Sequence, residues 1–149
     1  MECGECTVCC TLSVVPELGK KAGEQCMHCD GGCNIYGNHP QSCKDFNCAW
    51  VQHDGKFSSK EVKEQYLKLR PDRCGTMFFK KSDTIFCGAV MTDQQVTDLA
   101  RQQIESFKEQ GYSVVMLKIG EKPYVLPVSE LSATEVYSEY VETLMNGDL

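Results

Sequence analysis

The amino-acid sequence predicts an α+β protein. A cysteine-rich segment over residues 1–56 precedes an antiparallel sheet of about four strands, covered by helices, over residues 57–149. Three observations predict this division. Nine of the eleven cysteines lie in the first 48 residues, two pairs of β-prone runs lie beyond residue 75, and an amphipathic helical pattern follows each pair. The length of 149 residues suits one compact unit built from both parts.

The first part of the chain shows little hydrophobic periodicity. Turn signals punctuate it at Gly31-Gly32, Gly37-Asn38 and His39-Pro40. We therefore expect residues 1–56 to consist of loops and short turns that a bound metal holds together.

The second part begins with a helix and a hairpin. Ser58-x-x-Glu61 has the form of a capping box, apolar residues follow at helical spacing, and Pro71 ends the pattern. Strands are predicted over Thr76–Phe79 and Thr84–Val90, joined by a short polar turn.

The rest of the second part repeats this organisation. Thr92-x-x-Gln95 predicts the start of a helix that Gly111 ends, and strands are predicted over Val114–Ile119 and Tyr124–Val128. A last helix is expected from Ser132. The apolar face of the first of these helices is predicted to consist of Val96, Leu99, Ala100, Ile104 and Phe107. The order β-β-α-β-β-α favours an antiparallel sheet with helices on one face.

Composition argues against two classes of partner. The formal net charge is −6 and the sequence pI is about 5.1, so there is no electrostatic basis for nucleic-acid binding. The basic pairs Lys20-Lys21 and Lys80-Lys81 are interpreted as solvated turns. No apolar stretch has the length of a membrane span, and no leader pattern precedes the first cysteines, so we expect a soluble cytoplasmic protein. In a reducing compartment, dense cysteines indicate metal binding rather than disulfides.

The first ten residues contain a CxxCxxCC array formed by Cys3, Cys6, Cys9 and Cys10. Two cysteines separated by two residues can hold one soft metal ion from a single turn. Because neighbouring side chains diverge, Cys9 and Cys10 either serve two centres or one of them faces the core. A ferredoxin cluster run needs a fourth cysteine at the position of Ser13, so that spacing fails. Zinc and an iron–sulfur cluster both remain open on spacing alone.

These motifs resemble the zinc- or iron-chelating proteins of the CxxCxxCC cysteine cluster family (YkgJ-like). The second matching block runs from Cys26 through Cys33-Asn34-Ile35-Tyr36 to Pro40-x-x-Cys43-Lys44-Asp45-Phe46. The resemblance covers about the first fifty residues. The metal ligands that it implies are Cys3, Cys6, Cys9, Cys10, Cys26, Cys33 and Cys43. His39 and Lys44 replace arginines of the family pattern. Cys29 and Cys48 lie outside that pattern and are additional candidates.

Other residues near the array receive simpler interpretations. Cys74 and Cys87 are expected to be buried as small apolar side chains. His28 and His39 are secondary ligand candidates, ahead of His53. The aromatic residues Tyr36, Phe46 and Trp50 are expected to form the wall of the site.

The sequence thus predicts a metal-binding protein whose thiolates hold a structural metal, with zinc expected first and iron or a [4Fe–4S] cluster as the alternative cofactor. Surplus cysteines also support two other functions, an iron–sulfur redox protein or metal-assisted enzyme, and a metal storage or delivery protein. The second part shows no catalytic constellation, so enzymatic activity is left open. The α+β part is expected to dock against this metal-organised surface and to present it to a protein partner.

Overall fold

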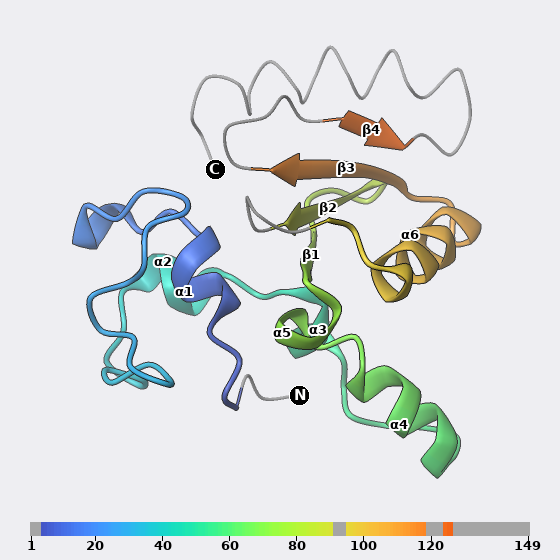
Figure 1. Ribbon diagram of the computed structural model, residues 1–149, viewed down its shortest axis with the longest axis horizontal. Coiled ribbons are helices and arrows are strands. Elements are labelled where there is room, and N and C mark those ends of the chain that lie inside the picture. The colour runs from blue at the N-terminus through green and yellow to red at the C-terminus, as the bar shows by residue number, and fades with distance from the viewer. Residues whose placement is uncertain (1–3, 91–94, 119–123, 127–149) are drawn as a thin grey trace.

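The computed structural model describes residues 4–90, 95–118 and 124–126, with side chains described up to residue 118 (Figure 1). These residues form an α+β fold, as the sequence predicts. Cys3, the turn predicted at residues 120–123 and the helix predicted from Ser132 lie outside the described residues. Among the helices described, none combines the length and apolar character that a membrane span requires.

The sheet is built from β1 (Thr76–Lys80), β2 (Ile85–Val90), β3 (Ser113–Lys118) and β4 (Tyr124–Leu126), in that order. β1 and β2 form the predicted antiparallel hairpin, with Phe78 opposite Gly88. β3 and β4 also pair antiparallel. β2 and β3, however, run parallel, with Cys87 opposite Val115. The prediction of a wholly antiparallel sheet is therefore wrong, and the sheet is mixed.

The connection between β2 and β3 explains the parallel pairing. Helix α6 (Asp98–Glu109) lies between these strands in the chain. Twelve residues of helix span about 18 Å, close to the length of a six-residue strand at about 3.3 Å per residue. The helix therefore returns the chain to the end of the sheet where β2 began, which is the arrangement of a β-α-β unit. Gly111, with φ of 92°, follows the helix and allows the turn into β3.

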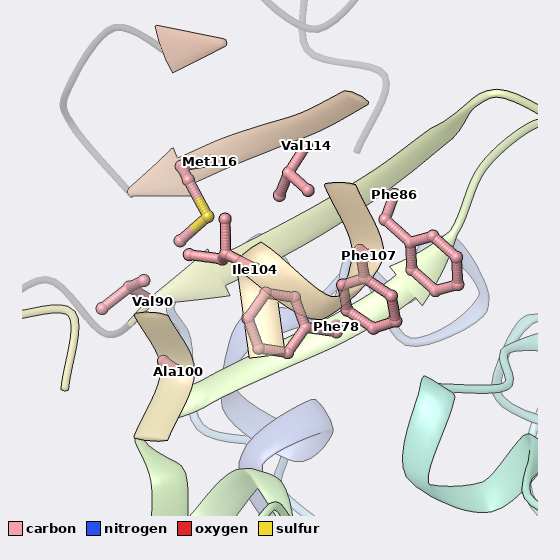
Figure 2. Close-up of a cluster of buried hydrophobic side chains, with 8 residues drawn as sticks. All are labelled: Phe78, Phe86, Val90, Ala100, Ile104, Phe107, Val114 and Met116. Carbon is pink, nitrogen blue, oxygen red and sulfur yellow. The ribbon is translucent and has the colours of Figure 1, made fainter. Parts of the chain in front are cut away.

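Helix α6 covers one face of the sheet through residues at spacings of four and three (Figure 2). Ala100, Ile104 and Phe107 project from the helix onto the strands, and Phe107 stacks on Phe86 with ring centroids 4.0 Å apart. This core cluster consists of Phe78, Phe86, Val90, Ala100, Ile104, Phe107, Val114 and Met116. A second cluster, formed by Ile85, Cys87, Val115 and Leu117, is built from the alternate positions of β2 and β3, which point to the other face.

Two further helices precede the sheet. The side-chain oxygen of Ser59 caps α4 (Lys60–Leu67), one residue after the predicted capping residue Ser58. α5 (Pro71–Cys74) begins at the proline predicted to end the preceding helix, and Arg70 and Asp72 form an ion pair of 2.6 Å at its start. Figure 1 shows α4 extending away from the rest of the molecule, which agrees with the exposure of Val62.

The cysteine-rich segment contains short helices separated by turns, as predicted. They are α1 (Val8–Leu12), η1 (Pro16–Leu18), α2 (Gln41–Asp45) and α3 (Ala49–Gln52). A third core cluster, formed by Leu12, Cys48, Trp50 and Met77, connects this segment to β1. The loops between α1 and α2 lie away from the sheet (Figure 1). Within residues 13–40 the buried apolar side chains comprise only Val15, so these loops have little core of their own.

Candidate metal centre

Main-chain hydrogen bonds bring two cysteine-bearing segments together. α1 carries Cys9 and Cys10, and the carbonyl oxygen of Cys10 accepts a hydrogen bond of 2.9 Å from the N–H of Cys26. The N–H of Cys29 donates to the carbonyl of Cys26 over 3.1 Å, and Cys29 pairs with Cys33 in an isolated β-bridge. These contacts fix the loop that contains three cysteines against the helix that contains two.

The third segment is α2, which begins after Pro40. The N–H of Cys43 donates to the carbonyl of Pro40 over 3.1 Å. Ser42 anchors the helix to the rest of the segment, because its N–H and hydroxyl donate to the carboxylate of Glu17 over 2.9 and 2.5 Å. Because these hydrogen bonds stabilise the charged carboxylate, they hold the pKa of Glu17 below its usual range.

The thiols of these segments form one group, which we call the main thiol group: Cys9, Cys10, Cys26, Cys29, Cys33 and Cys43. The thiol of Cys10 donates to the sulfur of Cys9, and the thiol of Cys29 donates to the sulfur of Cys10. The bond to Cys9, followed by burial, raises the pKa of Cys10 far above its ordinary value. Burial raises the pKa of Cys43, and the negative charges that its neighbours Cys26, Cys10 and Cys33 would carry raise it further.

The pKa values of these thiols are raised because the charged thiolates are unfavourable in this environment. Burial disfavours the charged thiolates, and repulsion between neighbouring thiolates adds to this effect, so the protonated forms are favoured while no cation compensates their charge. A soft metal ion reverses this preference because it binds the thiolate and displaces the proton. The chemistry of the donor set therefore fits a soft metal ion.

The side chains of Cys9 and Cys10 lie close enough to interact with each other. Cys9 also packs against the core cluster of Leu12, Cys48, Trp50 and Met77, and Cys10 also interacts with Cys29.

Cys6 lies with a different pair of cysteines. Its sulfur accepts hydrogen bonds from the main-chain N–H groups of Val8 and Asp72, and burial is the main cause of its raised pKa. Its charge also acts on the thiols of Cys48 and Cys74, whose pKa values are raised chiefly by burial. The thiol of Cys74 is fully buried and donates to the carbonyl of Thr76 over 3.1 Å, as expected for a structural cysteine.

The cysteines that the family resemblance implies, where the structure describes them, lie in two groups. Cys9, Cys10, Cys26, Cys33 and Cys43 belong to the main thiol group, and Cys29 joins them. Cys6 and the additional candidate Cys48 lie with Cys74 in the smaller group. In the described part of the chain every cysteine is a free thiol. Over the same residues, no three or more His, Cys, Asp or Glu side chains stand in the geometry of a preformed metal site.

The histidines near the group have other contacts. Nδ1 of His39 accepts a hydrogen bond of 3.0 Å from the N–H of Gly37, and its ring stacks on Tyr36. Nδ1 of His53 accepts from the N–H of Gly55 over 3.0 Å, and its ring stacks on Phe57.

The predicted aromatic wall is only partly correct. Trp50 is buried in the third core cluster and Phe46 packs against it. Tyr36, in contrast, is 72% exposed. The reason is that Tyr36 follows Cys33 in a tight turn at the surface, closed by the N–H of Tyr36 donating to the carbonyl of Cys33, where its ring stacks on His39.

Lys20 is the functional candidate that sequence reasoning missed. The pair Lys20-Lys21 was expected to be a solvated turn, but Lys20 is only 6% exposed. Its ammonium donates to the carbonyls of Thr11 (3.0 Å), Ser13 and Lys21 (3.3 Å). Burial lowers the pKa of Lys20, while the charges of Cys26, Cys10, Glu24 and Cys43 act in the opposite direction. Lys21, the other member of the pair, is exposed as expected.

Comparison of the chain with protein-family models, curated proteins and solved structures finds no match. The resemblance to the CxxCxxCC family therefore remains a prediction that depends on the spacing of the cysteines and on the residues around them.

Proposed function

We propose that this protein binds a soft metal ion through thiolates of the main thiol group, and that the metal is structural for the cysteine-rich segment. One relationship carries the proposal: the N–H of Cys26 binds the carbonyl of Cys10, and the charges of Cys10, Cys26 and Cys33 all act on the thiol of Cys43, although these residues are far apart in the chain. Because residues 13–40 contribute little to an apolar core, an additional source of stability is needed there.

In this proposal, metal binding is linked to the loss of protons from the thiols and to folding of the segment. Binding requires thiolates, so each ligand loses its proton when the metal enters. When bound, the metal supplies positive charge and bonds that cross-link the three segments. The free energy of binding then becomes free energy of folding for this segment. The main-chain hydrogen bond between Cys26 and Cys10 already brings two of the segments into register.

Zinc is the metal we propose first, because structural sites of zinc use cysteine thiolates in tetrahedral sets. Six thiols exceed the four of one such site, so a second ion or an iron–sulfur cluster is the alternative.

The direct test is elemental analysis and visible absorption of protein purified without oxygen. We expect one or two zinc ions per chain and no colour, and Cys26→Ser or Cys43→Ser should lower the zinc content by at least one ion. Cys87→Ala is the matched control, because Cys87 is fully buried in the sheet, and it should retain all the metal. Iron with acid-labile sulfide would favour the redox function instead. Protein that contains no metal and binds none when it is added would contradict the proposal.

A further inference from the structure

A buried positive charge lies beside the main thiol group. Lys20 is 6% exposed, and its ammonium is fixed by the carbonyls of Thr11, Ser13 and Lys21. A lysine is seldom buried to this degree without a compensating charge, because removing an ammonium from water is costly. Carbonyl oxygens satisfy its hydrogen bonds but carry no net charge. The compensating negative charge must therefore come from elsewhere.

Main-chain geometry shows which anions are available. Thr11 and Cys10 are adjacent in α1, so the carbonyl that holds the ammonium belongs to the residue after Cys10. The carbonyl of Cys10 binds the N–H of Cys26, and the carbonyl of Thr11 also accepts from the N–H of Gly23 over 2.9 Å. These contacts place Lys20 where the segments carrying Cys10 and Cys26 meet. The carboxylate of Glu24 also acts on Lys20, but it is exposed and its charge is screened by water.

We propose that Lys20 is a positioning residue that supplies a fixed counter-charge to the thiolates of Cys10, Cys26 and Cys43 when they hold the metal. This inference rests on the proposed function. A tetrahedral set of four thiolates around a divalent ion carries two excess negative charges, and a buried ammonium reduces that excess to one. Lys20 also closes the turn of residues 16–19, since Val15 and Lys20 form an isolated β-bridge.

The hydrogen-bonding and electrostatic roles of Lys20 predict different behaviour for two substitutions. Lys20→Arg keeps the positive charge, whereas Lys20→Gln keeps a hydrogen-bond donor and loses the charge. Close opposite charges in a partly buried place change a binding constant by about one power of ten or more. We therefore expect Lys20→Gln to bind Zn²⁺ about tenfold more weakly than the unmodified protein and Lys20→Arg to stay within about threefold. Lys21→Gln is the matched control because Lys21 is exposed, and it should leave affinity unchanged.

Zn²⁺ affinity would be measured by competition with a chromophoric chelator, and the thiolate-to-metal charge-transfer band of the Co²⁺-loaded protein would report the charge beside the sulfurs. We expect the band to shift in Lys20→Gln and to keep its position in Lys20→Arg. Equal affinity and an unshifted band in Lys20→Gln would overturn the role of Lys20 while leaving the proposed function intact. If the unmodified protein bound neither Zn²⁺ nor Co²⁺, the proposed function itself would fail.

Amine acylation of the unmodified protein, read by mass spectrometry, gives a test that does not depend on a variant that folds. In the metal-loaded protein Lys20 should resist acylation while Lys21 reacts. After chelation Lys20 should react as well, because the metal-organised loops no longer enclose it. Acylation of Lys20 as fast as that of Lys21 in the loaded protein would overturn the inference.

Discussion

The N–H of Cys26 donates a hydrogen bond of 2.9 Å to the carbonyl oxygen of Cys10, across sixteen residues of chain. This bond connects the first cysteine motif to the second. It closes a loop with few apolar contacts, and the conformational entropy lost in closing such a loop has to be offset by some other interaction. A metal shared by the thiols of both motifs would supply that interaction.

Gly88 is required by close packing in the centre of the sheet. A Cβ atom at this position would lie 2.7 Å from Sδ of Met116 and 2.8 Å from Cε1 of Phe78. We expect Gly88→Ala to lower the free energy of unfolding by about 1–3 kcal/mol through overpacking. Gly32→Ala is the control, since its added Cβ meets nothing within 4 Å. Urea denaturation of both variants provides the measurement, and equal stability would contradict the packing described.

Thr97 joins α6 to the end of α5. Its hydroxyl accepts from the N–H of Ala100 over 3.2 Å and donates to the carbonyl of Cys74 over 2.6 Å. Thr97→Ala should lower the free energy of unfolding by about 1–2 kcal/mol, because it removes a helix cap and leaves a part-buried carbonyl without its partner. Thr97→Ser keeps both hydrogen bonds and should recover most of the loss. Thermal unfolding of the two variants provides the measurement. Equal losses of stability in both variants would show that the hydroxyl has no such role.

Cys87 makes stability depend on pH in the alkaline range. Burial raises the pKa of Cys87 from 9.0 to about 12. Between these values the unfolded chain loses a proton that the folded chain keeps, so the stabilising contribution is complete below pH 9 and declines as pH rises toward 12. The decline is about 1.4 kcal/mol per pH unit at most. Cys87→Ala should therefore lose less stability than the unmodified protein between pH 9 and 11, measured by denaturant unfolding at each pH. Parallel curves would argue against a buried protonated thiol.

Much of the second part of the fold follows from the sequence. The positions of β1 and β2 agree with the predicted runs to within a few residues, because alternation records which side chains are buried. The helical spacing likewise identifies the buried face of α6, but the predicted start at Thr92 is wrong, because the helix begins at Asp98 with Thr97 as its cap. The direction of β3 does not follow from its own residues. It depends on whether the preceding helix crosses the sheet, which is a property of the length and docking of α6 rather than of either strand.

The metal ligands predicted from the sequence stay a prediction, although the structure shows which of the described cysteines interact. Cysteine spacing identifies which residues can hold a soft metal, and five of the seven predicted ligands do lie in one group. Spacing does not record which thiols meet across the fold: Cys29 joins the main thiol group, and Cys6 lies with Cys48 and Cys74. Nor does sequence separate Lys20 from Lys21, since only tertiary contacts bury one of the pair.

Hydrogen exchange with and without metal tests the central claim most directly. Main-chain amides of residues 8–46, including that of Cys26, would be followed by mass spectrometry or NMR in the metal-loaded protein and after complete chelation. The account predicts that chelation accelerates exchange in this segment by at least about a hundredfold, equivalent to about 2.7 kcal/mol, while amides of β1, β2 and β3 keep their protection. Unchanged exchange of the Cys26 amide after complete removal of the metal would contradict a structural role for metal in this protein.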